Sequence, residues 1–269
     1  MEYKDVDLQD TAEKLKSPNV LNMDEERLDV RIDGRDISKA DQVVIMAHGF
    51  GTDLHERGLF DQIAEKLTKD NQDRSVVRFS YSGFGESEGS QKVKSLDTMA
   101  EDFVSVYDYI KANSKRDCQI DVIGFSLGCN VVSKACLALK EKPYQALIIN
   151  PAQFEIKDSM QEYFKARPQT VIDEDGVWNL KRSDGSVSYV GEEFWKSIDD
   201  PEELRGNLVL LAAESNTVLI RAMNDDVVDM SESFSDVPFM ATVPLSGDHN
   251  YSKPENRKMF LETVWEMLD

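Results

Sequence analysis

Short apolar runs alternate with longer amphipathic stretches along most of the chain. The apolar runs predict strands over residues 42–47, 75–81, 120–124, 144–149, 217–222 and 240–245. Most of these runs are continuous, which is typical of strands buried on both faces of a parallel sheet. Apolar residues with helical spacing predict helices over residues 59–70, 95–114, 127–139 and 254–268. The alternation predicts an α/β fold with a mostly parallel sheet and helices on both faces. Residues 28–32 are a candidate edge strand.

One stretch, residues 153–201, departs from this rhythm. It is polar and aromatic, and turn signals at Asp175-Gly176 and Asp184-Gly185 indicate a small hairpin. A stretch of this length without a sheet strand is too long for a plain loop in a compact domain. We therefore interpret it as an inserted cap that divides the core into residues 1–152 and 202–269. The alternative is a small second domain with no functional role.

Composition limits the class of partner. The 269 residues allow one large domain or two small ones, and 41% of them are hydrophobic, which is enough for a buried core. Lys and Arg number 31 against 51 Asp and Glu, a formal net charge of −20. A surface this acidic repels phosphate backbones and anionic lipid head groups. We therefore expect neither nucleic acid nor a membrane as a partner.

The first residues, the lack of a long apolar run and the cysteines indicate where in the cell the protein is expected. The chain has no apolar run of about 18 residues, the length that a bilayer span requires. Its first residues are charged and lack the apolar stretch of a secretory signal. These features predict a cytoplasmic protein. Cys118, Cys129 and Cys136 form an odd set without metal-ligand spacing, so we expect reduced thiols and no metal.

A candidate nucleophile lies between a predicted strand and a predicted helix. Residues 124–128 read Gly-Phe-Ser-Leu-Gly, a G-x-S-x-G pattern. A serine on such a tight turn projects its hydroxyl above the sheet, and small neighbours are needed because the strand and helix backbones approach closely. The helix N-terminus favours a developing negative charge. This context indicates that Ser126 is the nucleophile.

A second match to the pattern occurs at residues 85–89, Gly-Glu-Ser-Glu-Gly. A polar loop follows it instead of a helix, and Glu86 and Glu88 would oppose an oxyanion there. We therefore expect Ser87 to be a loop residue and favour Ser126 as the nucleophile.

A serine hydroxyl needs a neighbouring base near neutral pH. His249 lies in the loop just past the last predicted strand, so we expect it at the same carboxyl edge of the sheet as Ser126. The acid that orients it depends on which segment forms the preceding strand. If residues 208–213 form it, the expected position falls at Asn216 and no acid is present. If residues 217–222 form it, Asp225 is in place.

The spacing of Leu204, Leu208, Leu211 and Ala212 is helical, which favours the second interpretation. Asp225 is therefore the preferred acid and Asp226 the alternative. A structural role as a helix N-cap remains open for either aspartate.

Residues 48–51 read His-Gly-Phe-Gly and follow the first long apolar run. Backbone amides in such a loop can face an oxyanion, so we assign the amides of Phe50 and Leu127 as its donors. We expect His48 to hold the loop by hydrogen bonds, and His55 has no assigned role.

These motifs together resemble the α/β-hydrolase fold superfamily over most of the chain, from about residue 28 onward. The order Ser126, Asp225, His249 matches the order of that superfamily's triad. The loop FSYSGFGESEG and the segment after Asn150-Pro151 are most similar to the cinnamoyl/feruloyl-esterase-like serine hydrolases and to related acylaminoacyl-peptidase-like proteins.

The resemblance implies a serine esterase with a Ser126-His249-Asp225 triad that forms an acyl-enzyme on Ser126. It implies a small-molecule ester as substrate and no cofactor, and it leaves a homodimer open. The alternatives are a thioesterase or peptidase on the same triad, and a ligand-binding homologue without catalysis.

Overall fold

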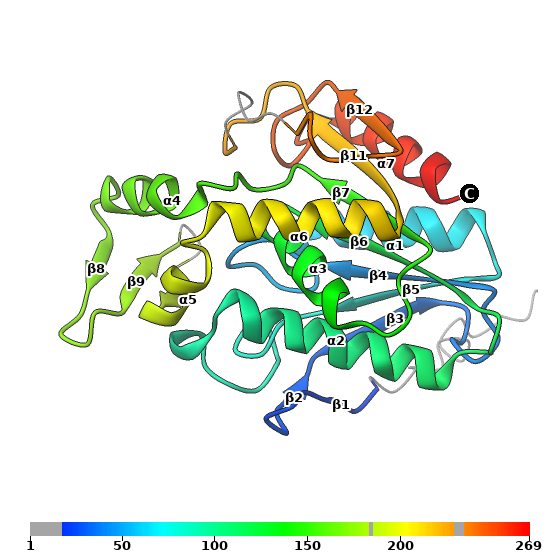
Figure 1. Ribbon diagram of the computed structural model, residues 1–269, viewed down its shortest axis with the longest axis horizontal. Helices are drawn as coiled ribbons and strands as arrows, with labels where there is room; N and C mark the ends of the chain where they lie inside the picture. Colours follow the sequence, from blue (N-terminus) through cyan, green and yellow to red (C-terminus); the bar gives the residue numbers. More distant parts are fainter. Residues whose placement is uncertain (1–17, 183–184, 229–233) are drawn as a thin grey trace, which may run out of the picture.

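The computed structural model describes residues 18–182, 185–228 and 234–269. The main strands are β3 (Val30–Gly34), β4 (Gln42–Ala47), β5 (Arg74–Phe79), β6 (Gln119–Phe125), β7 (Gln145–Ile149), β11 (Asn216–Ala222) and β12 (Ala241–Leu245). They form a seven-stranded sheet in the order β12-β11-β7-β6-β4-β5-β3 (Figure 1). Neighbouring strands pair in parallel, except that β3 lies antiparallel to β5 at one edge.

Helices cover both faces of the sheet. One face packs against α2 (Leu96–Asn113), α3 (Leu127–Ala138) and α6 (Pro201–Glu214), and the other against α1 (Leu59–Asp70) and α7 (Pro254–Leu268). In β4, Val43 and Ile45 belong to the first core, whereas Val44 and Met46 belong to the second. A strand buried on both faces has no polar side, which is why its apolar run is continuous.

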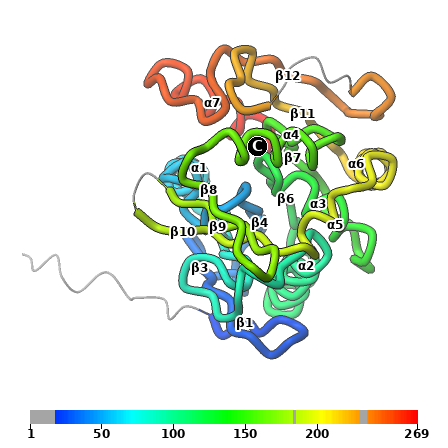
Figure 2. The backbone as a smooth tube through the Cα atoms, turned by 90° about the vertical axis from the view of Figure 1, so that its left-hand side faces the viewer, coloured from blue at the N-terminus to red at the C-terminus, as the bar shows by residue number. Residues whose placement is uncertain are grey.

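The segment between β7 and α6 forms a small unit at the carboxyl end of the parallel strands (Figure 1). It consists of α4 (Ile156–Lys165), β8 (Thr170–Ile172), β9 (Trp178–Lys181), β10 (Val187–Val190) and α5 (Glu192–Ser197). Figure 2, which looks onto this end, shows the unit in front of the sheet. The three strands are antiparallel in the order β10-β9-β8. The predicted turn at Asp175-Gly176 joins β8 to β9, and Asp184 of the other predicted turn lies outside the described residues.

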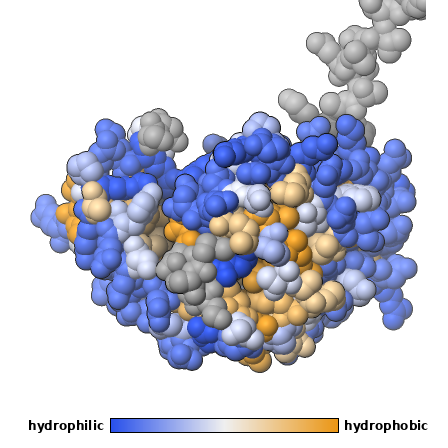
Figure 3. Space-filling view, turned by 90° about the horizontal axis from the view of Figure 1, so that it is seen from above, coloured by the Kyte–Doolittle hydropathy of each residue, from blue (hydrophilic) through white to orange (hydrophobic). Residues whose placement is uncertain are grey.

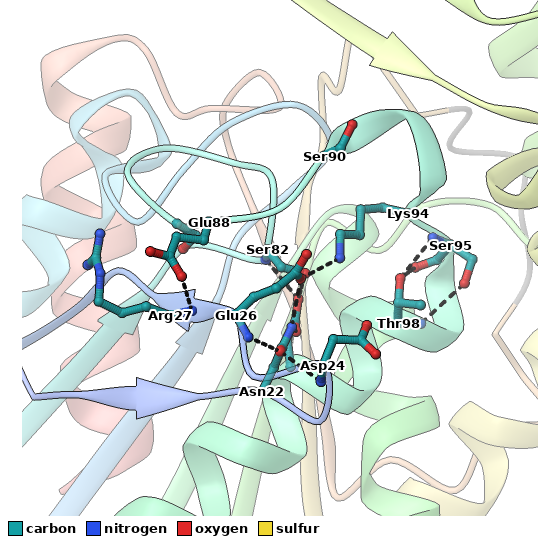
Figure 4. Close-up of polar contacts among 12 residues, drawn as sticks. Asn22, Asp24, Glu26, Arg27, Ser82, Glu88, Ser90, Lys94, Ser95 and Thr98 are labelled. Carbon is teal, nitrogen blue, oxygen red and sulfur yellow. Dashed lines mark hydrogen bonds and ion pairs between the residues drawn. The ribbon is translucent and has the colours of Figure 1, made fainter.

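A two-stranded ribbon, β1 (Val20–Leu21) and β2 (Arg27–Leu28), precedes the sheet. Polar contacts attach the turn of this ribbon to α2 and to the loop that precedes α2 (Figure 4). Asn22 donates to the Asp102 carboxylate at 2.8 Å, and Lys94 donates to Glu26 at 2.8 Å. Two short 3-10 turns, η1 (Glu56–Gly58) and η2 (Gln91–Val93), lie in the connecting loops.

The observed boundaries agree closely with the sequence predictions. For α1, α7 and β4 they coincide with the predicted ranges. The α/β fold class is therefore confirmed. The segment that includes residues 208–213 is part of α6, whose N-cap Asp200 accepts from two backbone amides of the first turn, so the strand interpretation of that segment is wrong. The strand before the acid loop is β11, as the preferred interpretation required.

Seen from the side of β12 and α7, hydrophobic residues gather between hydrophilic ends (Figure 3). No helix in the described ranges has both the length and the apolar character needed to cross a bilayer. Residues 1–17, which bear on the predicted cytoplasmic location, lie outside those ranges.

Candidate active site

Ser126 forms the turn between β6 and α3. It adopts φ 53° and ψ −122°, a backbone conformation that is strained for a residue with a side chain. A Cβ at Gly124 would lie 2.7 Å from the Cα of Cys129, and one at Gly128 would overlap the carbonyl oxygen of Ala47. Strand and helix therefore approach so closely that only glycine fits on either side of the serine.

His249 and Asp225 form a buried pair. The Nδ1 atom of His249 lies 2.7 Å from Oδ2 of Asp225, and the two side chains are only 5% and 2% exposed. The other carboxylate oxygen of Asp225 accepts from the backbone amides of Val227 and Val228 at 2.9 and 2.8 Å. Burial by itself would raise the pKa of Asp225, but the hydrogen bond and charge of His249 and the two amides outweigh it and lower that pKa. The carboxylate is thus fixed in its ionised form against the ring.

The sheet explains why these two residues meet. Strands β11 and β12 run parallel with Ala222 opposite Leu245, so the loops that follow them leave the same edge together. A backbone hydrogen bond of 2.9 Å from Asn224 to Gly247 joins the two loops. Asp225 is the next residue after Asn224, and His249 is two residues after Gly247.

Asn150, at the end of β7, connects the same loops from the side of the nucleophile. Its side-chain amide donates to the His249 carbonyl at 2.8 Å, and its oxygen accepts from the Ala222 amide at 2.7 Å. The residue is buried and has a positive φ of 45°. It therefore fixes the position of the histidine loop relative to β11. The sequence carried one signal for it, a polar residue directly after a buried strand.

The His-Gly-Phe-Gly loop follows β4. Burial lowers the pKa of His48 to about 4, so its ring is neutral near pH 7. Nδ1 of His48 lies 2.9 Å from the Gly49 carbonyl, and Nε2 accepts from the Tyr81 amide at 3.3 Å. A neutral ring that donates through Nδ1 satisfies both contacts. His48 thus holds the loop in the way expected from the sequence.

Glu56 is a buried carboxyl group beside this loop that sequence reasoning missed. It accepts from the Gly49 amide at 2.6 Å and from the Thr52 hydroxyl at 2.7 Å, and it is 2% exposed. Burial raises its pKa, although both hydrogen bonds act in the opposite direction. A Cβ at Gly49 would lie 3.2 Å from Glu56 Oε2 and 3.3 Å from Ser126 Cβ, so the carboxyl group is close to the candidate nucleophile.

One cavity of about 300 Å³ brings the predicted residues together. Ser126, His249, Phe50 and Leu127 all line it. Asp225 contacts the far side of the His249 ring through Nδ1. Leu127 is the first residue of α3, where backbone amides have no partner within the helix, and Phe50 is in the loop after β4. The arrangement places a hydroxyl, an imidazole and two candidate amide donors around one space.

The alternative residues have other contacts. The Ser87 hydroxyl accepts from the Asp29 amide at 2.8 Å and donates to the Ser80 carbonyl at 2.7 Å, so it joins its loop to the strand region. Asp226 is exposed, and its carboxylate accepts from the backbone amide of His249 at 3.3 Å, not from the ring. Nδ1 of His55 lies 2.8 Å from the Asp61 carboxylate, and neither residue lines the cavity.

Similarity to solved structures identifies the fold. Est1E from Butyrivibrio proteoclasticus, with ferulic acid bound, has a TM-score of 0.69 at 18% identity, and the match covers 93% of this chain and 97% of that chain. Mouse alpha/beta hydrolase domain-containing protein 10 has a TM-score of 0.67 at 19% identity, covering 93% and 97%. The Pyrococcus furiosus esterase PF2001 has a TM-score of 0.66 at 18% identity, covering 94% and 89%. The fold is that of an α/β hydrolase, as the sequence motifs predicted.

A comparison with sequence families matches a shorter part of the chain than the solved structures do. Residues 38–175 match the family of serine aminopeptidases, S33. The chain therefore belongs to this family of serine hydrolases. A comparison with curated protein sequences gave no match.

Proposed function

We propose that this protein is a carboxylester hydrolase that works through an acyl-enzyme on Ser126. The observation that carries the proposal is the buried Asp225–His249 pair at 2.7 Å, beside a cavity that both His249 and the strained Ser126 line. A serine next to an imidazole that a buried carboxylate orients is the acyl-transfer machinery of serine hydrolases.

In the proposed first step, His249 Nε2 takes the proton of the Ser126 hydroxyl as the oxygen attacks the ester carbonyl. A bond forms between serine Oγ and the carbonyl carbon. The bond from that carbon to the alcohol oxygen then breaks, and the alcohol leaves with the proton held by His249. Water reverses the sequence in the second step, releasing the acid and restoring the serine hydroxyl.

Asp225 accepts the Nδ1 proton of His249, which fixes the tautomer with a free Nε2 and stabilises the imidazolium that forms. The Phe50 and Leu127 amides are the proposed donors to the oxyanion of the tetrahedral intermediate. Removing such a donor typically costs about 10²- to 10³-fold in rate. No step in this scheme uses a cofactor.

We also propose that residues 153–201 act as a cap over the cavity. Phe164 of α4 packs on Phe50 with ring centroids 5.6 Å apart, and Leu180 and Arg182 line the same space as Ser126. These contacts support a role of the segment in the substrate pocket over a separate domain with no functional role.

An ester is favoured because similar solved structures include proteins named esterases. The second candidate is an aminopeptidase, which the description of the matching family favours. Both chemistries can use one triad. Rates on 4-nitrophenyl butyrate, a matched butyryl thioester and alanine 4-nitroanilide decide between ester, thioester and amide cleavage.

The same assay tests the nucleophile. We expect the wild type to cleave 4-nitrophenyl butyrate and Ser126→Ala to reduce turnover to the uncatalysed background while the protein stays folded. Ser87→Ala is the matched control, because it removes the serine of the other motif, and it retains activity. Saturable ligand binding without turnover of any of the three substrates would instead identify a binding homologue.

A further inference from the structure

The cavity at Ser126 has a charge opposite to that of the chain as a whole. Four cationic side chains line it, those of Arg57, Arg167, Lys181 and Arg182. Among the residues that the structure describes, its acidic lining side chains are Glu56 and Asp226. The whole chain has 31 Lys and Arg against 51 Asp and Glu. Among the described residues, cations are therefore in excess at this one opening, whereas acids are in excess over the chain as a whole.

Three of these cations come from the cap. Arg167 follows α4, Lys181 ends β9 and Arg182 follows it. Arg182 is held in place: its Nε atom donates to the Ser188 hydroxyl at 2.6 Å. Its guanidinium occupies the space that a side chain at Gly51 would need. It thus lies against the loop that contains Phe50, next to the proposed oxyanion donor.

Arg167 lies over aromatic rings of the same cavity. Its guanidinium carbon is 4.3 Å from the Tyr163 ring centroid and 5.7 Å from that of Phe164. Stacking on the ring face, together with the hydrogen bond that Nη2 of Arg167 donates to the Tyr163 hydroxyl, keeps the charge in a defined position. The neighbouring lining side chains Ile156, Met160 and Leu180 are apolar. The cavity therefore combines an apolar wall with a cationic border.

A guanidinium matches the two oxygens of a carboxylate by paired hydrogen bonds. A cleft with one sign of charge also concentrates ligands of the opposite sign and speeds their association. Because the rest of this surface repels anions, the local excess at the cavity selects for them there.

We propose that the substrate of this enzyme is an ester with an apolar body and a carboxylate, which Arg167, Lys181 and Arg182 of the cap bind. This inference rests on the proposed hydrolase function and adds the class of substrate. The carboxylate is a second anionic group, distinct from the acid that hydrolysis releases.

The test compares two esters that differ in one charge. Mono-4-nitrophenyl glutarate carries a free carboxylate on its acyl chain, and methyl 4-nitrophenyl glutarate carries a methyl ester in its place. We expect kcat/KM to be at least about tenfold higher for the charged ester at low salt. This preference should shrink as sodium chloride is raised to 0.5 M, since salt screens the attraction. A matched pair with the carboxylate on the alcohol side, 4-carboxyphenyl butyrate and its methyl ester, shows which half of the substrate carries it.

Variants assign the effect to the cap. In Arg167→Gln/Lys181→Gln, we expect the ratio of kcat/KM between charged and neutral ester to fall about tenfold. Arg167→Lys keeps the charge but loses the planar fork, and a partial fall is expected. Lys258→Gln is the control, since Lys258 is an exposed cation of α7 outside the cavity lining, and it should leave the ratio unchanged.

The two proposals fail in different ways. If a neutral fluorophosphonate labels Ser126 and both esters are cleaved without charge preference, the hydrolase stands and the carboxylate inference is overturned. The same holds if the preference exists but the cap variants leave it unchanged. If neither ester is cleaved and Ser126 is not labelled, the proposed hydrolase function fails, and the inference built on it fails too.

Discussion

The backbone amide of Gly49 donates to the buried carboxyl group of Glu56 at 2.6 Å. This bond joins the start of the loop that contains Phe50 to η1, which follows the loop. The Thr52 hydroxyl donates to the same carboxyl oxygen. The two hydrogen bonds lower the pKa of the carboxyl group, but burial outweighs them and raises that pKa. We therefore expect Glu56 to act as a positioning residue for the proposed oxyanion donor.

Glu56→Ala leaves the Gly49 amide buried without this partner, which costs about 1–3 kcal/mol of unfolding free energy. We expect kcat for 4-nitrophenyl butyrate to fall about 10- to 100-fold, because a small displacement of the loop misplaces the donor. Glu56→Gln keeps an acceptor oxygen and should lose less of both. Equal kcat in wild type and Glu56→Ala would contradict the positioning role.

The raised pKa of Glu56 also predicts how stability depends on pH. A raised carboxyl pKa stabilises the folded state below the unfolded value, which is 4.5, and this contribution is lost as pH rises through the folded pKa. Glu56→Gln does not titrate. Its unfolding free energy relative to wild type should therefore increase as pH rises from 4.5 toward neutrality. A difference that stays constant over this range would show that Glu56 titrates normally.

Asp225→Asn tests the orienting acid. The change removes the charge that stabilises the imidazolium and favours the wrong tautomer, so we expect kcat to fall about 10³- to 10⁴-fold. Asp226→Asn is the matched control, because the hydrogen bond of its carboxylate among the described residues goes to the backbone amide of His249 and not to the ring. A larger loss in Asp226→Asn than in Asp225→Asn would reverse the assignment.

The lowered pKa of Asp225 has the opposite consequence for stability. It stabilises the folded state above the unfolded value of 3.8, and the contribution is lost as pH falls through the folded pKa. The difference in unfolding free energy between wild type and Asp225→Asn should therefore be largest near neutral pH. It should shrink below about pH 3.8, as denaturant titrations at several pH values can show.

Two glycine substitutions test the turn at the nucleophile. An added Cβ at Gly128 overlaps the carbonyl oxygen of Ala47, so Gly128→Ala should lower the free energy of unfolding by about 3 kcal/mol. Gly206 lies in α6 with open space around it, and Gly206→Ala should raise that free energy by about 0.5–1 kcal/mol. Equal effects in chemical denaturation would mean that strand and helix do not approach as described.

The three cysteines should be inert in the folded protein. All are buried free thiols, and burial raises the pKa of Cys136 to about 12 and also raises those of Cys118 and Cys129. A thiol that stays protonated is a poor nucleophile. An aromatic disulfide reagent at pH 8 should react with none of them in the native state and with all three in denaturant. Rapid native labelling of any one would contradict its burial.

Much of the fold was predictable, because strands buried on both faces leave continuous apolar runs such as 42–47. The turn at Ser126 was predictable for a similar reason: its glycines are dictated by close backbone contact within a few residues. Helical spacing alone distinguished α6 from a strand and so selected the loop of Asp225.

Other parts of the site depend on contacts between distant segments. Glu56 has no pattern around it in the sequence, since its role follows from the path of the loop back to Gly49. Asn150 joins loops that are separated by many residues along the chain. The cationic border of the cavity arises from α4, β9 and the loop before α1, which meet only in the folded chain. Periodicity and motif spacing carry no information about such meetings.

The most direct measurement is the intact mass of the protein after treatment with a fluorophosphonate, followed by mapping of the modified residue. An activated serine next to a base reacts with this probe, whereas an ordinary surface serine does not. We expect one adduct, on Ser126, which is absent in Ser126→Ala and forms more slowly in His249→Ala. An unmodified wild-type protein, or an adduct on Ser87, would contradict it.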